Sequence, residues 1–260
     1  MKRTRTVGFP VAGTTGFVRT RDGERISFVR AEGATDHAIV VAHGFTGSWR
    51  QPRVQKVIAE LTQVGTVFAL DFRGHGASSG TCTVGNAEVL DVDALVTHAY
   101  DQGFPTVSTV GFSMGGGVVL RHAALFEDTP SHVASVVSVS APAYWYYRGT
   151  RVMRLVHHLV MRPPGRALMR ARGTRLDARP WPDPPPMSPV EAVAALKRTP
   201  TLIVHGDQDR YFPVEHADAL IAAGRDVDGL RIEGFGHAES AISAATLKQI
   251  GAWIDARRGR

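Results

Sequence analysis

A serine enclosed by glycines carries the strongest chemical signal in this sequence. The pentapeptide GFSMG at 111–115 follows the apolar run 107–110 and precedes two further glycines and a long apolar stretch. It therefore reads as G-x-S-x-G between a strand and a helix. A nucleophilic serine has to stand on a sharp turn, which flanking glycines allow, and a helix start beside it supplies free backbone N–H groups. The alternative, an incidental serine in a glycine-rich turn, is disfavoured by this placement, so Ser113 is the candidate nucleophile.

An acid and a base follow the serine in the chain. Asp207 and Asp209 come directly after the apolar run 201–204, and His237 follows a second apolar segment. A histidine that accepts the serine proton and a carboxylate that orients the imidazole are the partners that such a serine needs. Serine, aspartate and histidine in this order are one known arrangement of such a triad. Either aspartate could instead cap a loop; we favour Asp209 as the acid and keep Asp207 as its rival.

A third loop, HGFTG at 43–47, directly follows the apolar run 38–42. From such a loop the backbone N–H of Phe45 could point at a developing oxyanion, with the N–H of Met114 as second donor. The alternative is a simple turn in which His43 caps the loop by hydrogen bonding. We expect Phe45 and Met114 to form the oxyanion hole.

The elements that must position these residues alternate in type. Residues 17–20 and 26–31 around Asp22-Gly23 predict an antiparallel hairpin. Short apolar runs without alternation then predict strands buried on both faces, and between them apolar residues recur at helical spacing. The predicted strands are 38–42, 66–70, 107–112, 133–139, 201–204 and 230–233. We predict an α/β fold with a mostly parallel, doubly wound sheet, closed by a helix over about 242–256.

One segment interrupts this pattern and is strongly basic. From Arg148 to Arg179 there are nine arginines, no lysine and one acidic residue, so the segment carries +8 and the rest of the chain −2 of the total of +6. Within it, 152–160 predicts an amphipathic helix with a basic face, ended by two prolines, and six prolines lie between 180 and 189. We predict a single domain, with 1–141 and 190–260 as its core and 142–189 as an inserted basic cap.

The concentrated charge argues against a general nucleic-acid binder, which needs a broad positive surface. The arginines could attract an anionic acyl substrate or the phosphates of an acyl carrier, or dock on an anionic membrane, or form a solvated outer face.

The composition of the whole chain is that of an ordinary globular protein, with 43% hydrophobic and 21% charged residues. A single cysteine, Cys82, excludes an internal disulfide framework. No run of about 18 apolar residues predicts a membrane span, and the basic start at residues 2–5 lacks the apolar core of an export signal. We expect a cytoplasmic protein that needs no metal or organic cofactor; the oligomeric state stays open.

These motifs together resemble the α/β-hydrolase superfamily over nearly the whole chain, from about Phe17 to Ala256. The loop at 43–45 is similar to the family's oxyanion loop, and 71–80 to its D-x-R-G-H-G-x-S-x-G turn. Residues 111–115 are similar to its nucleophile elbow, and 206–213 with 236–237 to its acid and base loops. In the family's G-x-x-D-x-x-x-P acid loop the catalytic aspartate corresponds to Asp209. Within the superfamily, the turn at 77–80 is similar to that of small esterases of the cinnamoyl-esterase or serine-aminopeptidase-like type.

The resemblance implies Ser113 as nucleophile, His237 as general base and later acid, and Asp209 as the group that orients the imidazole. It also implies oxyanion donors at Phe45 and Met114. Hydrolysis of a carboxylic ester through an acyl-enzyme is the expected reaction, with a small-molecule acyl substrate. The alternatives are a thioesterase on acyl-CoA or carrier-bound substrates and, from another class, a ligand-binding protein on the same fold without turnover.

Overall fold

The computed structural model describes residues 12–258 of the chain. The start of the basic N-terminal segment, including residues 2–5, lies outside the described residues. Eight strands form one sheet in the order β1-β2-β4-β3-β5-β6-β7-β8. Their bounds are β1 Thr14–Arg19, β2 Arg25–Ala31, β3 His37–Ala42, β4 Thr66–Leu70, β5 Thr106–Phe112, β6 Ser135–Val139, β7 Thr201–Gly206 and β8 Val227–Ile232.

The sheet begins antiparallel and continues parallel. β1 pairs antiparallel with β2, and β2 with β4, whereas every pairing from β4 to β8 is parallel. All residues of β3, β4, β6 and β7 are buried. Strands covered on both faces need no polar alternation, which explains the continuous apolar runs of the sequence. The predicted fold class is confirmed.

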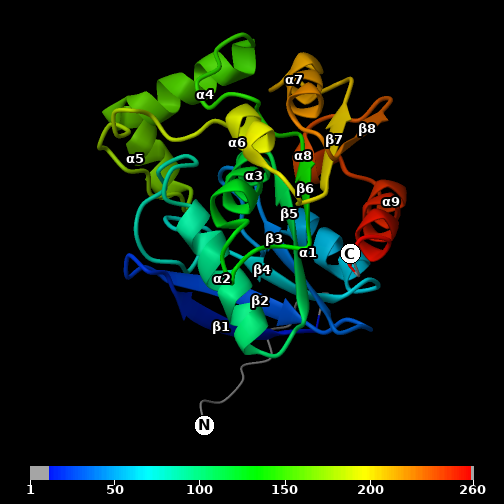
Figure 1. Ribbon diagram of the computed structural model, residues 1–260. Coiled ribbons are helices and arrows are strands. Elements are labelled where there is room, and N and C mark those ends of the chain that lie inside the picture. Colours follow the sequence, from blue (N-terminus) through cyan, green and yellow to red (C-terminus); the bar gives the residue numbers. More distant parts are fainter. Residues whose placement is uncertain (1–11, 259–260) are drawn as a thin grey trace.

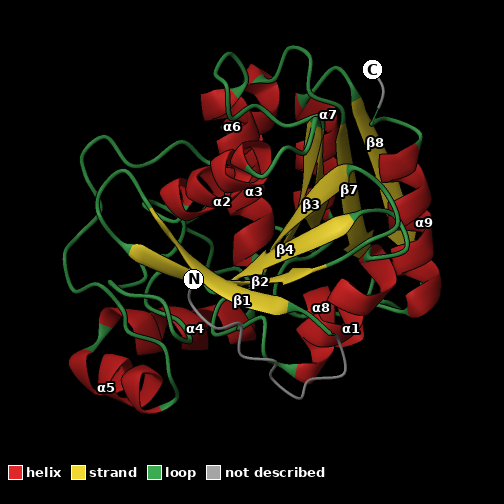
Figure 2. Ribbon diagram, turned by 90° about the horizontal axis from the view of Figure 1, so that it is seen from below, coloured by secondary structure: helices red, strands yellow, loops and turns green. Residues whose placement is uncertain are grey.

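Helices cover both faces of the sheet (Figures 1 and 2). Side chains alternate across β3, so that Ala38 and Val40 pack toward one hydrophobic cluster and Ile39 and Val41 toward the other. The first cluster lies beneath α2 Val89–Asp101, α3 Met114–Phe126, α6 Pro189–Ala195 and α7 Glu215–Ala223. The second lies beneath α1 Pro52–Leu61, α8 Ala238–Ala241 and α9 Ala244–Asp255.

Between β6 and α6 the chain leaves the sheet. This segment contains two further helices, α4 Arg151–Met161 and α5 Pro163–Ala171, which pack against each other and stand away from the sheet in both views (Figures 1 and 2). The division of the chain into a core and a cap at 142–189 stays a prediction. Thr174 forms a bridge with His75, and Leu176 with Cys82, so the end of the segment is tied to the loop after β4.

Three helices, α5, α6 and α8, were not predicted, and one strand was predicted out of place. Pro163-Pro164 does end α4, but the same prolines occupy the first turn of α5, where their missing N–H groups cost no hydrogen bond. At the start of α6, Ser188 and Glu191 form a reciprocal capping box on either side of Pro189. β8 starts at Val227, earlier than predicted, because this edge strand exposes Asp228 and its apolar run is interrupted.

Of the described residues, 12–258, none lies in a helix that is long and apolar enough to cross a bilayer.

Candidate active site

Ser113 stands between the end of β5 and the start of α3 with a positive φ of 51°. Such a conformation costs a non-glycine residue about 1–3 kcal/mol and persists only where neighbours enforce it. Here the N–H of Ser113 donates to the carbonyl of Val139 at 2.8 Å, at the end of the adjacent strand. A Cβ on Gly115 would lie 2.4 Å from the carbonyl oxygen of Ala42, so only glycine lets α3 start this close to β3. The turn therefore holds Ser113, which is half-buried, at the carboxyl edge of the sheet.

His237 and Asp209 meet Ser113 at the same edge, because the carboxyl ends of parallel strands converge there. The Ser113 Oγ and the His237 Nε2 are 2.9 Å apart, and the His237 Nδ1 lies 2.7 Å from the Asp209 Oδ2. The Asp209 side chain is fully buried, and the imidazole is 15% exposed. These distances fit a neutral imidazole that donates from Nδ1 to the carboxylate and accepts the serine hydroxyl at Nε2.

Asp209 is held as a carboxylate by its surroundings. Burial acts to raise the pKa of Asp209, but the hydrogen bond and charge of His237 and the N–H groups of Phe212 and Tyr211 outweigh it and hold the pKa below its usual value. The two N–H groups donate to Oδ1 at 3.1 and 2.8 Å. Asp207, by contrast, accepts from the N–H of Gly234 at 2.7 Å and faces solvent. The structure thus places Asp209, and not its rival, against the imidazole.

Aromatic rings enclose the imidazole. The Tyr211 ring stacks on His237 with centroids 4.1 Å apart and planes at 22°, and the Phe212 ring lies 5.8 Å away. The Phe212 ring also lies beside the Tyr147 ring, with their centroids 6.1 Å apart. A groove of about 450 Å³ next to these rings is lined by Tyr144, Tyr147, Pro213, Glu215 and His216. An apolar surface therefore continues outward from the candidate triad.

The loop at 43–47 passes directly over Ser113. A Cβ on Gly44 would lie 3.3 Å from the Ser113 Cβ. The N–H of Met114 is the first of α3, where no carbonyl of the helix can accept it. Within residues 12–258, neither this N–H nor that of Phe45 has a hydrogen-bond acceptor. Both predicted oxyanion donors are thus left free.

Two neutral histidines fix this loop. The His43 Nε2 accepts from the N–H of Phe72 at 3.1 Å, and its Nδ1 lies 2.7 Å from the carbonyl of Gly44. The His75 Nε2 accepts from the N–H of Thr46 at 3.2 Å. Burial, with a smaller contribution from His75, lowers the pKa of His43 to about 3, and burial also lowers the pKa of His75. His43 therefore acts as a loop-capping residue, the alternative that the sequence left open.

The turn at 71–80 braces the loop from below. Asp71 accepts from the Ser48 hydroxyl at 2.6 Å and from the N–H groups of Trp49 and Ala77, and it pairs with Arg50. These contacts join the strand ends of β3 and β4. Asp71 thus holds two loops together and touches none of the triad residues.

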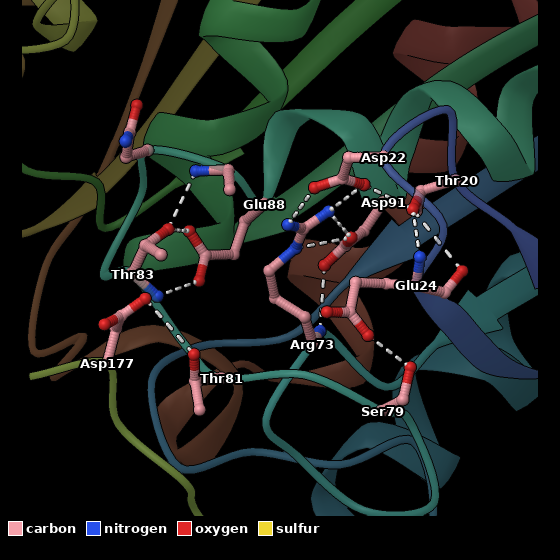
Figure 3. Close-up of polar contacts among 12 residues, drawn as sticks. Thr20, Asp22, Glu24, Arg73, Ser79, Thr81, Thr83, Glu88, Asp91 and Asp177 are labelled. Carbon is pink, nitrogen blue, oxygen red and sulfur yellow. Dashed lines mark hydrogen bonds and ion pairs between the residues drawn. The ribbon is translucent and has the colours of Figure 1, made fainter. Parts of the chain in front are cut away.

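Arg73 ties the same turn to α2 and to the first hairpin. Its guanidinium lies 2.8 Å from Asp91 and 2.7 Å from Asp22 (Figure 3). Burial acts to lower the pKa of Arg73, but the two carboxylates outweigh it and raise that pKa above its usual value. Further along, the Thr81 hydroxyl donates to Asp177 at 3.3 Å, which links the turn to the segment after α5 (Figure 3).

Comparison with known proteins agrees with this geometry. The family model of the serine aminopeptidases S33 (Hydrolase_4) matches residues 33–180, more than half of the chain. The chain belongs to this family of α/β hydrolases. The predicted superfamily and the prediction of a hydrolase are therefore confirmed. No curated protein matches the sequence.

Solved structures of other hydrolases share the fold at low sequence identity. An esterase of Pyrococcus furiosus, Pf2001, is 21% identical with a TM-score of 0.73, over 95% of this chain and 93% of that one. Est1E of Butyrivibrio proteoclasticus, solved with ferulic acid, is 19% identical with a TM-score of 0.70, over 94% of this chain and all of that one. A membrane phospholipase A is 18% identical with a TM-score of 0.69, over 95% of this chain and 87% of that one.

Two positioning residues of this hydrolase escape sequence reasoning. The Ser140 hydroxyl accepts from the N–H of Ala238 at 3.0 Å and so fixes the backbone after His237. The buried Glu239 accepts from the N–H of Gly44 at 3.2 Å and lies 4.0 Å from Arg53. The only hint in the sequence is an acidic residue two positions after the histidine. Its partner lies 195 residues away, so no local pattern identifies the contact.

Four consecutive aromatic residues, at 144–147, take different positions. Tyr144 and Tyr147 line the groove beside Phe212. Trp145 points inward, where its Nε1 donates to the carbonyl of Met187 at 2.8 Å. Tyr146 is 68% exposed. The first and last of these four therefore face the groove that begins beside Phe212.

Proposed function

We propose that the protein hydrolyses a carboxylic ester through an acyl-enzyme intermediate. The observation that carries this proposal is the continuous set of contacts from Ser113 through His237 to Asp209, at 2.9 and 2.7 Å. Nucleophile, base and orienting acid at hydrogen-bond distance are the arrangement that activates a serine at neutral pH. The esterases among the structural relatives support the same reaction class.

In the first half of the reaction, the Ser113 Oγ attacks the ester carbonyl while its proton passes to the His237 Nε2. The carbonyl oxygen becomes an oxyanion, and the free N–H groups of Phe45 and Met114 stabilise it; one such donor is worth about 3–4 kcal/mol. The intermediate then collapses, the bond from carbon to the alkoxy oxygen breaks, and the imidazolium donates its proton to the departing alcohol. Asp209 keeps Nδ1 protonated and stabilises the imidazolium.

In the second half, a water molecule repeats these steps on the acyl-enzyme. His237 takes a proton from the water as it attacks the acyl carbon, and the same two N–H groups bind the second oxyanion. When the bond to Ser113 breaks, the proton returns from the His237 Nε2 to the Oγ. The products are a carboxylic acid and an alcohol, and the protein needs no cofactor for either half.

Hydrolysis of p-nitrophenyl esters of increasing acyl length, measured beside acyl-CoA thioesters of the same acyl groups, tests the proposal. We expect saturable ester hydrolysis that Ser113→Ala abolishes. A kcat/KM that is higher for every thioester than for its ester would make the protein a thioesterase instead. Saturable ligand binding without turnover of either series, unaffected by Ser113→Ala, would favour a binding protein on this fold.

A further inference from the structure

The helix pair α4–α5, residues 151–171, is attached to the molecule mainly by its ends. α4 buries none of its residues, and α5 buries only Gly165 and Met169. Each helix packs chiefly against the other, and both views show the pair away from the sheet (Figures 1 and 2). We call residues 146–172 the cap hairpin. Its outer face is not covered by any other part of the described chain.

Large apolar side chains are exposed on the cap hairpin. Tyr146 is 68% exposed, Leu155 59%, Met161 69% and Leu168 41%, and these are four of the seven large apolar residues that are exposed in the described chain. Scattered exposed apolar residues are normal on a protein surface, but a cluster on one projecting element marks an interaction site.

The cap hairpin is also rich in exposed arginines. The cap hairpin contains seven arginines, none of which forms an ion pair within the described residues: Arg148, Arg151, Arg154, Arg162, Arg166, Arg170 and Arg172. The sequence has no acidic residue between Asp128 and Asp177. Arg151 lies one turn before Leu155, and Arg154 lies two turns before Met161, so basic and apolar side chains share one face of α4. The surface is thus both cationic and apolar.

We propose that the cap hairpin docks the protein on an anionic lipid bilayer. A bilayer surface offers negative headgroups for the arginines and, a few ångströms deeper, an apolar region for the leucine, methionine and tyrosine side chains. Each basic residue near such a surface raises the partition coefficient of the protein onto the membrane by about fivefold. The charge and the apolar side chains are therefore both accommodated by one occupant.

Other anionic partners fit the surface less well. A small anionic substrate would need arginines that converge on one point, whereas these lie along both helices and six of the seven are exposed. A nucleic acid would pair with the arginines but would leave Leu155, Met161 and Leu168 in water. The exposed aliphatic side chains therefore favour a lipid surface.

Docking would also orient the candidate active site. The Thr150 hydroxyl at the start of α4 donates to the carbonyl of Tyr211 at 3.0 Å, beside the ring that stacks on His237. Three residues beyond the other end of the hairpin, Arg175 is bonded through its backbone to Gly74 and Cys82. The hairpin therefore bridges two loops of the candidate site. Delivery of lipid-borne esters to Ser113 would follow, and this consequence alone rests on the proposed function.

Co-sedimentation of the full-length Ser113→Ala protein with vesicles tests the docking without requiring catalysis. One set of vesicles contains phosphatidylcholine alone, and the other contains equal parts of phosphatidylcholine and phosphatidylglycerol. We expect binding to the anionic vesicles only, weakened by added salt. Equal binding to both sets, or to neither, would overturn the proposal.

Two sets of substitutions locate the surface and separate lipid from other polyanions. On the same background, R151Q/R154Q/R170Q should weaken vesicle binding by at least tenfold, whereas K56Q/R225Q/K248Q, which removes three exposed charges elsewhere, should change it less than threefold. L155S/M161S keeps every charge and should also weaken binding by at least tenfold. Equal losses in both charge variants, or undiminished binding of L155S/M161S, would contradict a bilayer-docking hairpin. Circular dichroism and melting temperature establish that each variant is folded.

Discussion

The carboxylate of Glu239 accepts a hydrogen bond from the backbone N–H of Gly44 at 3.2 Å, joining the loop of the candidate base to the loop over the serine. Both Glu239 oxygens also lie 3.3 Å from the place where a Gly44 Cβ would stand. Two residues before Glu239 is His237, and one residue after Gly44 is Phe45. One buried side chain therefore fixes the relative position of the proposed base and one proposed oxyanion donor.

Loss of this contact should lower turnover more than substrate binding. We expect Glu239→Ala to lower kcat by about tenfold or more with little change in KM, because the Phe45 N–H would no longer be held toward the oxyanion. Glu239→Gln keeps an acceptor oxygen and should recover most of the loss. The control Glu233→Ala removes an exposed carboxylate from the same part of the chain. Equal kcat for Glu239→Ala and Glu233→Ala would show that the contact does not position the loop.

The two aspartates of the acid loop should differ sharply in their effect. Asp209→Asn should lower kcat by about 10⁴-fold, because an amide cannot keep Nδ1 protonated and facing it. Asp207 lies two positions earlier in the same loop, and its carboxylate accepts from the N–H of Gly234, so Asp207→Asn should stay within a few fold of the wild type. Steady-state rates of the two variants on one ester substrate decide between them. A larger loss for Asp207→Asn would reverse the assignment of the acid.

The Tyr211 ring should support the imidazole by packing alone. It covers one face of His237 with the ring centroids 4.1 Å apart, and its hydroxyl forms no hydrogen bond within residues 12–258. Tyr211→Phe should therefore keep the wild-type rate, whereas Tyr211→Ala should lower kcat several-fold because His237 loses one of its packing surfaces. The measurement is kcat with melting temperature as the control for folding. If Tyr211→Phe is as slow as Tyr211→Ala, the hydroxyl has a role of its own.

Stability should fall as the medium becomes mildly acidic. Burial lowers the pKa of His122 and of His37 to about 4, and that of His43 to about 3, from a usual 6.5. Below pH 6.5 the unfolded chain therefore takes up protons that the folded chain does not, so the free energy of unfolding decreases down to about pH 4. Melting temperatures at several pH values between 7.5 and 5 measure this decrease.

Replacing one of these histidines should flatten the slope. His122 is fully buried, stacks on Phe126, and has no hydrogen-bond partner for either ring nitrogen within the described residues. His122→Leu should therefore make the melting temperature less dependent on pH between 6.5 and 5, and His158→Gln, at an exposed position, should leave the dependence unchanged. An unaltered slope in His122→Leu would mean that this residue does not link folding to protons.

The sequence was most informative where local pattern and chain order coincide. Buried parallel strands have continuous apolar runs, and the turns at their carboxyl ends contain the residues with chemistry, so Ser113, Asp209 and His237 could be predicted together. The start of α5 could not, because Pro163-Pro164 ends one helix and begins the next, and the two roles look alike in sequence.

What sequence patterns cannot supply is the long-range contact. Glu239 contacts Gly44, which is 195 residues away in the sequence, and Ser140 contacts Ala238, which is 98 residues away. The neighbouring residues in the sequence predict neither contact. The exposure of Leu155 and Met161 could not be predicted from sequence either. The apolar spacing in this segment predicts an amphipathic helix, but only the fold determines which face of that helix stays uncovered.

Intact-mass labelling with a fluorophosphonate, run on the wild type and on Ser113→Ala, tests whether Ser113 is an activated nucleophile. The probe detects such a serine without a choice of substrate. We expect one covalent adduct on the wild type and none on the variant. No adduct on folded wild type, or an equal adduct on Ser113→Ala, would contradict the assignment of Ser113, His237 and Asp209 as the hydrolytic site.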